Sequence, residues 1–150
     1  MPDVTLRPVV AEDLPILYAH QADPEAARVA SFPSRDREAF FAHWARIREV
    51  PSGLARAVLA DGQVVGNIVS WDAEGVRLVG YWIGREHWGR GIATAALAAF
   101  LEVDRTRPLH ALVAVDNVGS IRVLEKSGFV RSDERRSSGD DVEELLYRFA

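Results

Sequence analysis

The stretch WGRGIAT at residues 88–94 combines residue types that together can bind an anion. Gly89 and Gly91 let a ligand approach the backbone closely, Arg90 adds a positive charge, and the Thr94 hydroxyl can donate to an anion or cap a helix. The start of a helix after Gly91 would add unpaired N–H groups and the positive end of the helix dipole. The spacing therefore predicts a phosphate site, and a tight strand-to-helix connection without a ligand is the alternative.

Two common phosphate loops do not fit this stretch. The chain contains no GxxxxGK[ST] sequence, and GRGIAT lacks both the third glycine and the acidic residue that follows about twenty positions later in a dinucleotide-binding fold. These absences disfavour a module that binds ATP or NAD through this loop.

The elements around the loop predict an α/β (α+β) fold with a mixed, mostly antiparallel sheet. The alternating segments and the turn signal Asp61-Gly62 indicate a meander of strands, and the apolar positions after Gly91 recur with helical spacing. A strand, helix, strand succession at residues 76–115 predicts a parallel pair with a right-handed crossover. The expected strands are 4–10, 54–60, 63–71, 76–84, 108–115, 129–132 and 142–149, and the expected helices are 11–20, one from Ser34 or Asp36 to about 50, one from 92, and 117–128.

Composition limits the classes of protein to which the chain can belong. Its 150 residues are 48% hydrophobic and show no linker or repeat, so one domain over residues 1–150 is expected. Without cysteine, and with histidines that lack ligand spacing, a metal site is not expected. No apolar run is long enough for a membrane span, which predicts a cytoplasmic protein without membrane attachment. The net charge of −4 argues against a nucleic-acid partner.

Two separated segments resemble the motifs of one enzyme family. GYWIGREHWGRGIATAAL (80–97) is similar to the acetyl-CoA motif of the GCN5-related N-acetyltransferases (GNAT), whose core is [Q/R]xxGx[G/A], and NVGSIRVLEKSGF (117–129) is similar to their second motif. Within the family the chain most resembles the ribosomal-protein N-terminal acetyltransferase branch. The resemblance implies about seven strands, about four helices and a V-shaped opening between strands that end near Gly84 and Val115.

The resemblance also implies the reaction and the residues that bind the cofactor. Acetyl-CoA would donate an acetyl group to a primary amine, either a protein N-terminus or a small molecule, in a monomer or homodimer that needs no metal. The pyrophosphate would meet the N–H groups of residues 89–94, Asn117 would bond the cofactor arm, and backbone near Trp82 and Ile83 would hold the acetyl carbonyl. The complete implied set is Trp82, Ile83, Gly84, Arg85, Trp88, Gly89, Arg90, Gly91, Ile92, Ala93, Thr94, Asn117, Ser120 and Lys126.

Two positions depart from the family pattern. Trp88 stands where many relatives have glutamine or arginine, which leaves side-chain help for the pyrophosphate to Arg85 or Arg90. Leu124 stands where many members have the tyrosine that protonates the departing thiolate. The resemblance makes Ser120 the candidate proton donor, with a purely helix-capping serine as the alternative.

The general base and the acceptor pocket have weaker sequence support. The base is not identified by any motif, and Asp72, Glu74 or His87 acting through water are the possibilities. Four aromatic residues are predicted to shape the acceptor pocket, with a place in the core as the alternative for each: Phe32, Trp44, Trp71 and Tyr81. Because tyrosine and base are both missing, a non-catalytic acyl-CoA sensor or interaction module is the competing function.

Overall fold

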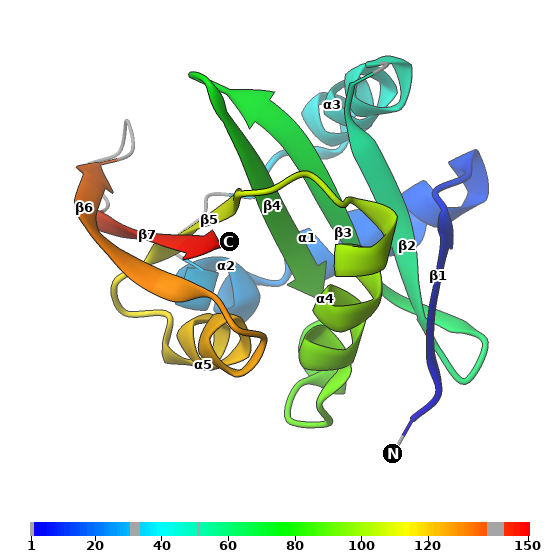
Figure 1. The fold of residues 1–150 in the computed structure, drawn as a ribbon. Helices are drawn as coiled ribbons and strands as arrows, with labels where there is room; N and C mark the ends of the chain where they lie inside the picture. The colour runs from blue at the N-terminus through cyan, green and yellow to red at the C-terminus, as the bar shows by residue number, and fades with distance from the viewer. Residues whose placement is uncertain (1, 31–33, 51, 138–142) are drawn as a thin grey trace.

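One seven-stranded mixed sheet forms the centre of the molecule (Figure 1). The computed structural model describes residues 2–30, 34–50, 52–137 and 143–150, with the backbone alone for 133–137. The strand order is β1-β2-β3-β4-β5-β7-β6, and each neighbouring pair is antiparallel except β4 and β5, which are parallel. The strands are β1 (Val4–Pro8), β2 (Leu54–Ala60), β3 (Gln63–Ala73), β4 (Val76–Ile83), β5 (Leu109–Ala114), β6 (Val130–Ser137) and β7 (Glu143–Phe149).

The described residues form five α-helices, one more than the sequence analysis predicts. The additional helix is α2, whose seven residues are too few to show a helical period. Its start nevertheless has a recognisable signal, because Asp23 precedes Pro24 and its carboxylate accepts the Glu25 N–H at 2.9 Å. The helices are α1 (Leu14–Ala22), α2 (Pro24–Ala30), α3 (Arg37–Glu49), α4 (Ile92–Val103) and α5 (Val118–Lys126), with 3-10 turns at Ala11–Asp13 and Arg85–His87.

The predicted turn and cap signals are confirmed where they involve specific backbone conformations. Asp61 and Gly62 join β2 to β3 with φ values of 50° and 83°, the left-handed region that a two-residue hairpin turn requires. Asp36 caps α3 by accepting the Ala39 N–H at 2.8 Å. These short-range signals therefore predict the meander and the start of α3 correctly.

Two hydrophobic clusters cover the two faces of the sheet. On one face α4 packs with Leu97 and Phe100 fully buried, and Leu124 of α5 joins the same cluster. On the other face α1 and α3 bury Leu17, Phe40 and the Trp44 ring against β2. Figure 1 shows α4 in front of the strands and α1 behind them. The sheet is thus enclosed by helices, and burial of apolar surface on both faces supplies the main favourable free energy of folding.

The parallel pair opens into a V, as predicted. β4 and β5 are paired in register at Leu78 and His110, near the start of both strands. Beyond that point β5 turns away from β4 toward β7 (Figure 1). The helices that follow these two strands, α4 and α5, begin at the open end. The fold therefore brings the N-termini of two helices to the mouth of one opening.

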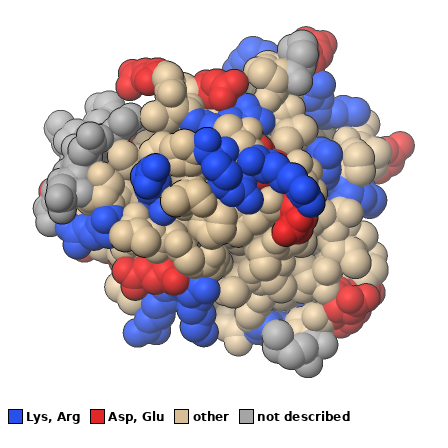
Figure 2. All heavy atoms as spheres, in the orientation of Figure 1, with Lys and Arg blue, Asp and Glu red and all other residues tan. Residues whose placement is uncertain are grey.

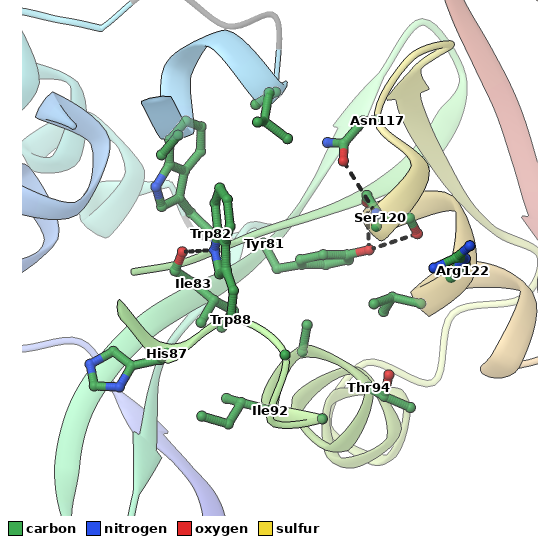
Figure 3. Close-up of a pocket in the computed structure, with 18 of the residues that line it drawn as sticks. Tyr81, Trp82, Ile83, His87, Trp88, Ile92, Thr94, Asn117, Ser120 and Arg122 are labelled. Carbon is green, nitrogen blue, oxygen red and sulfur yellow. Dashed lines mark hydrogen bonds between the residues drawn. The ribbon is translucent and has the colours of Figure 1, made fainter. Parts of the chain in front are cut away.

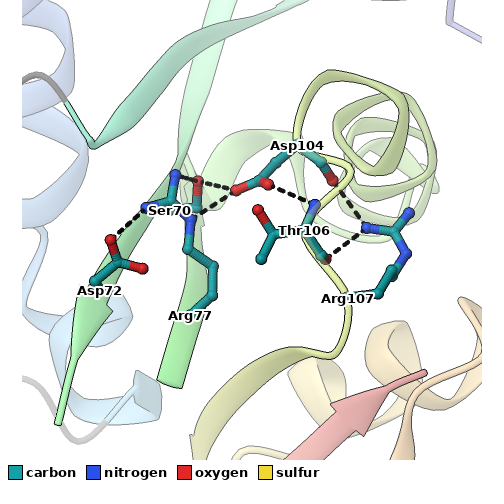
Figure 4. A network of polar contacts seen from close by, with 6 residues as sticks. All are labelled: Ser70, Asp72, Arg77, Asp104, Thr106 and Arg107. Atoms are coloured by element: carbon teal, nitrogen blue, oxygen red, sulfur yellow. Dashed lines mark hydrogen bonds and ion pairs between the residues drawn. The ribbon is translucent and has the colours of Figure 1, made fainter. Parts of the chain in front are cut away.

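A buried ion-pair network lies at the start of β4 (Figure 4). The Asp104 carboxylate at the end of α4 accepts the Ser70 hydroxyl at 2.6 Å and the Arg77 Nε–H at 2.9 Å. All three side chains are buried, and Arg77 also donates to the Ser70 hydroxyl oxygen at 3.2 Å and pairs with the exposed Asp72 at 3.3 Å. This network joins β3, β4 and α4 at the closed end of the V.

Close contact between β3 and β4 at the open end leaves no room for a side chain at position 66. A Cβ atom on Gly66 would lie 2.3 Å from the Trp82 carbonyl oxygen and 2.8 Å from the Ile83 Cδ1. Just beyond it, the Gly84 N–H donates to the Val65 carbonyl at 2.9 Å. The glycine thus allows the end of β4, which borders the opening, to be held tightly against β3.

Gly66→Ala is expected to lower the free energy of unfolding by about 1–3 kcal/mol, because the backbone of β4 must shift to relieve the overlap. Chemical denaturation monitored by circular dichroism measures the change. Gly53→Ala is the control, since its Cβ would lie 3.6 Å from the nearest atom and a change within about 0.5 kcal/mol is expected. Equal stability of Gly66→Ala and the wild type would contradict this account of the strand contact.

The face of the molecule in Figure 2 carries both basic and acidic side chains. Within the described part of the chain, no helix is both long and apolar enough to cross a membrane.

Candidate acetyl-CoA site

A cavity of about 450 Å³ lies at the open end of the V. Its wall is built by α2, the end of β4, the loop and first turn of α4, and α5 (Figure 3). It contains most of the residues implied to bind the cofactor: Trp82, Ile83, Trp88, Gly89, Gly91, Ile92, Ala93, Thr94, Asn117, Ser120 and Lys126. The two sequence motifs, far apart in the chain, therefore face one cavity.

The loop before α4 has the geometry of an anion site. Gly89 and Gly91 have φ values of 77° and 75°, which favour glycine, and Gly91 is the N-cap residue of α4. No side chain caps this helix and its first turn contains no acidic residue. The first N–H groups of α4, on the cavity wall, therefore have no partner within the helix and lie at the positive end of its dipole. The wall can stabilise a phosphate here.

Trp88 fixes this loop to the end of β4. Its indole N–H donates to the Ile83 carbonyl at 2.8 Å, while 42% of the residue surface stays exposed. This bond crosses the 3-10 turn Arg85–His87. The tryptophan thus holds the loop in place and presents an aromatic surface to the cavity.

Gly84 and the two arginines assigned to the cofactor do not line the cavity. Gly84 packs against the His20 ring, which would lie 2.7 Å from an added Cβ. Arg85 pairs with Asp23 at 2.7 Å in a separate hollow beside α1, and Arg90 lies 3.4 Å from the His87 Nδ1. Their contact with a pyrophosphate stays a prediction. In the structure it is the backbone of the loop, more than these guanidinium groups, that faces the cavity.

Asn117 and Ser120 meet at the start of α5. The Asn117 side chain accepts the Ser120 N–H at 3.2 Å and caps the helix, so Asn117 and not Ser120 is the capping residue. Ser120 instead places its hydroxyl 2.7 Å from the Tyr81 hydroxyl, as Figure 3 shows. Burial raises the pKa of Tyr81 to about 12, although the hydrogen bond with Ser120 opposes the rise. The phenol therefore stays protonated across the physiological pH range.

The aromatic residues assigned to the acceptor pocket are separated by the fold. Tyr81 lines the cavity, whereas Trp44 is 4% exposed and packs in the core with Phe40. Trp71 is 41% exposed on β3, where its ring covers Gly80. Phe32 lies outside the described residues. Neither Trp44 nor Trp71 borders this cavity. Trp44 is directed into the core by its position on α3, and Trp71 is directed to the outer surface of the sheet by its position on β3.

Of the three possible bases, His87 lines the cavity. Its ring lies between the Glu86 carboxylate and Arg90, each at 3.4 Å. Asp72 pairs with Arg77, and Glu74 has a φ of 51° in the turn between β3 and β4. Neither of these two carboxylates borders the cavity.

Several wall residues were not singled out from the sequence. Arg122 lies one helical turn before Lys126, so the i, i+4 spacing on the predicted helix 117–128 was the available signal. α2 contributes an apolar part of the wall through Ala26, Val29 and Ala30. In the sequence, the Asp-Pro pair at its start was the available signal for this helix. Within the described chain, no cluster of three His, Cys, Asp or Glu side chains could hold a metal ion.

The comparisons with known proteins agree with this geometry. One sequence relative, "Putative ribosomal N-acetyltransferase YdaF" of Bacillus subtilis (strain 168), is 32% identical in an alignment 108 residues long that covers 67% of this chain. The matched segment covers 58% of that protein's own length. Its name agrees with the branch that the motifs resemble.

Two solved structures show the same fold at low sequence identity. The aminoglycoside acetyltransferase AAC(6')-Ib in complex with coenzyme A has a TM-score of 0.83 at 18% identity, over 99% of this chain and 95% of that one. RimL, a ribosomal L7/L12 alpha-N-protein acetyltransferase in complex with coenzyme A, has a TM-score of 0.82 at 17% identity, over 97% and 93%. The profile described as Acetyltransferase (GNAT) domain matches residues 3–130. Motifs, fold and profile agree, and the chain belongs to the GNAT acetyltransferase family.

Proposed function

We propose that this protein transfers an acetyl group from acetyl-CoA to the nitrogen of a primary amine, either a protein N-terminus or a small-molecule amine. The observation that carries the proposal is the cavity at the open end of the V, which has both the uncapped start of α4 and Ser120 on its wall. The coenzyme A held by the AAC(6')-Ib and RimL structures supports the same cosubstrate here.

The cavity wall fits the parts of acetyl-CoA. The unpaired N–H groups at the start of α4 would bind the pyrophosphate, and Arg122 and Lys126 at the rim would add positive charge. The apolar residues between the strands suit the less polar arm, and the side-chain amide of Asn117 still has its two N–H donors after capping α5. The pyrophosphate and the less polar arm of the cosubstrate thus each have a complementary part of the wall.

Ser120 is the proposed proton donor for the departing sulfur. As the amine nitrogen bonds to the acetyl carbon, the C–S bond breaks and its electron pair goes to sulfur. Ser120 passes its proton to the sulfur, and water returns to Ser120 the proton that the amine nitrogen has lost. The net products are the acetylated amine and CoA with a free thiol. His87 on the wall is the proposed relay for the amine proton, through water.

Calorimetry with acetyl-CoA, CoA and ATP, followed by a thiol-release assay, tests the function. The amine panel should include peptides with free N-termini, lysine, polyamines, amino acids and aminoglycosides. We expect binding of acetyl-CoA and CoA, and thiol release with at least one amine class. Binding without turnover across the panel would support an acyl-CoA sensor instead, and binding of ATP alone would contradict the site.

Ser120→Ala is expected to lower kcat by roughly ten- to a thousand-fold with little change in acetyl-CoA affinity, because general acid catalysis contributes about this much. Single-turnover acetylation of the best amine measures the effect. Ser127→Ala is the matched control on the same helix, since the Ser127 hydroxyl donates to the Val123 carbonyl at 2.8 Å and lies outside the cavity. Full turnover in Ser120→Ala would remove Ser120 from the mechanism.

A further inference from the structure

The contact between Tyr81 and Ser120 joins two elements that face each other across the cavity. Tyr81 lies near the end of β4 and Ser120 in the first turn of α5, and their hydroxyl oxygens are 2.7 Å apart. Both residues line the cavity (Figure 3). The position of the family tyrosine, in contrast, is occupied by Leu124, which is 1% exposed in the core. The phenol therefore reaches the serine from the strand and not from the helix.

The direction of this hydrogen bond follows from the chemistry of the two groups. A phenol is more acidic than an aliphatic hydroxyl and is the better donor, and the serine oxygen is the better acceptor. The other acceptor near the phenol, the Ser120 carbonyl, lies 3.4 Å away, beyond the ordinary range for an O–H···O bond. Tyr81 thus donates to the Ser120 oxygen, and the serine keeps its own proton free to donate elsewhere.

Ser127, the residue directly after α5, shows another arrangement that a serine hydroxyl can adopt near this helix. Ser127 turns its hydroxyl back and donates to the Val123 carbonyl four residues earlier. Such back-bonding is one recognised arrangement of a serine hydroxyl in a helix. If Ser120 did the same, its proton would point at the backbone of residue 116 or 117 and not into the cavity.

We propose that Tyr81 is a positioning residue that holds the Ser120 hydroxyl toward the departing sulfur of acetyl-CoA. The inference rests on the proposed function. When Ser120 passes its proton to the sulfur, the hydrogen bond from the phenol also stabilises the negative charge that develops on the serine oxygen. Tyr81 keeps its own proton throughout, and the serine is reprotonated by water as above. The sequence pattern predicts a place for this tyrosine in the acceptor pocket, and its role toward the leaving group is the new inference.

Titration of the thiol of bound CoA tests the inference without an amine acceptor. A hydroxyl aimed at the sulfur stabilises the thiolate, which absorbs in the ultraviolet near 240 nm. Because the chain contains no cysteine, the thiolate signal belongs to CoA alone once the absorbance of the CoA-free protein is subtracted. We expect the apparent pKa of the bound thiol to be about one pH unit higher in Tyr81→Phe and in Ser120→Ala than in the wild type.

The double variant and a matched control separate positioning from general damage. Tyr81→Phe in the Ser120→Ala background should cause no further shift, since the phenol acts through the serine. Tyr147→Phe is the matched control. It removes a hydroxyl of β7 that donates at 3.0 Å to Glu125 of α5, and neither residue lines the cavity. This variant should leave the titration of the CoA thiol unchanged. With an accepted amine, Tyr81→Phe should lower kcat about ten-fold or more while the KM for acetyl-CoA changes less than two-fold.

The possible results distinguish this inference from the proposed function. Failure of the wild type to bind CoA in calorimetry would overturn both. CoA binding with the same thiol titration in Tyr81→Phe as in the wild type would overturn the positioning role alone. Additive shifts in the double variant would also overturn it, because they would mean that Tyr81 acts on the sulfur independently of Ser120.

Discussion

Gly91→Asp is expected to lower the affinity for acetyl-CoA by on the order of 100-fold or more, while the protein stays folded. Residue 91 is the N-cap of α4, with a φ of 75°, and lines the cavity. A carboxylate there places a negative charge where the pyrophosphate would bind, and facing like charges cost several kcal/mol. Calorimetry with acetyl-CoA and CoA measures the loss.

Gly91→Asn separates the effect of charge from that of bulk. Asparagine has nearly the same shape as aspartate, and both residues tolerate the left-handed conformation better than other side chains. An acidic side chain also favours the start of a helix, so Gly91→Asp should melt within a few degrees of the wild type. We expect Gly91→Asn to keep much more affinity than Gly91→Asp. Equal affinities of the two variants would attribute the effect to bulk, and unchanged affinity in both would refute the phosphate site.

Asp104→Asn is expected to lower the free energy of unfolding by about 3–5 kcal/mol at neutral pH, because it leaves the Arg77 guanidinium buried without its main charge partner. Asparagine keeps the shape of the side chain and can still accept the Ser70 hydroxyl, so the loss reports the charge. Chemical denaturation measures it. Asp72→Asn removes the other charge beside Arg77, but that carboxylate is exposed, and a change below about 1 kcal/mol is expected.

The same substitution should remove a dependence of stability on pH. Burial alone would raise the pKa of Asp104, but hydrogen bonds from Ser70, from Thr106 and from Arg77 lower it to about 2. In the unfolded chain the pKa of an aspartate is about 3.9. The stabilisation by the carboxylate is therefore complete above about pH 4 and is lost as the pH falls toward 2. The stability difference between wild type and Asp104→Asn should shrink over this range. A constant difference would contradict the role of the charge.

Local signals in the chain account for the elements that were predicted correctly. Asp61-Gly62 requires a left-handed turn wherever it occurs, and Asn117 can cap only the helix that follows it. Gly91 is a local signal of the same kind, because a glycine can adopt its left-handed conformation directly before α4. α2 was missed because its seven residues bury a single alanine and show no apolar period.

Contacts between distant segments decided what the sequence could not. Trp44 and Tyr81 look alike as aromatic residues on regular elements, but one is enclosed by α1, α3 and β2 and the other faces α5. Arg85, Arg77 and Ser120 each have one partner that is distant in the chain, at separations of 62, 27 and 39 residues respectively. No periodicity encodes such pairs, because they depend on how the strands are ordered and how the helices cover them.

The sequence by itself determined the family, the loop that can bind a phosphate and the cap of α5, because glycine conformations, helix starts and the apolar period depend on near neighbours. The tertiary structure decided which of these groups share one cavity. It placed Tyr81 of β4 beside Ser120 of α5 and directed Arg85 to Asp23. It also joined β3, β4 and α4 through Asp104. The physical reason is that burial and divergence of β4 from β5 fix the distances between groups that are far apart in the chain.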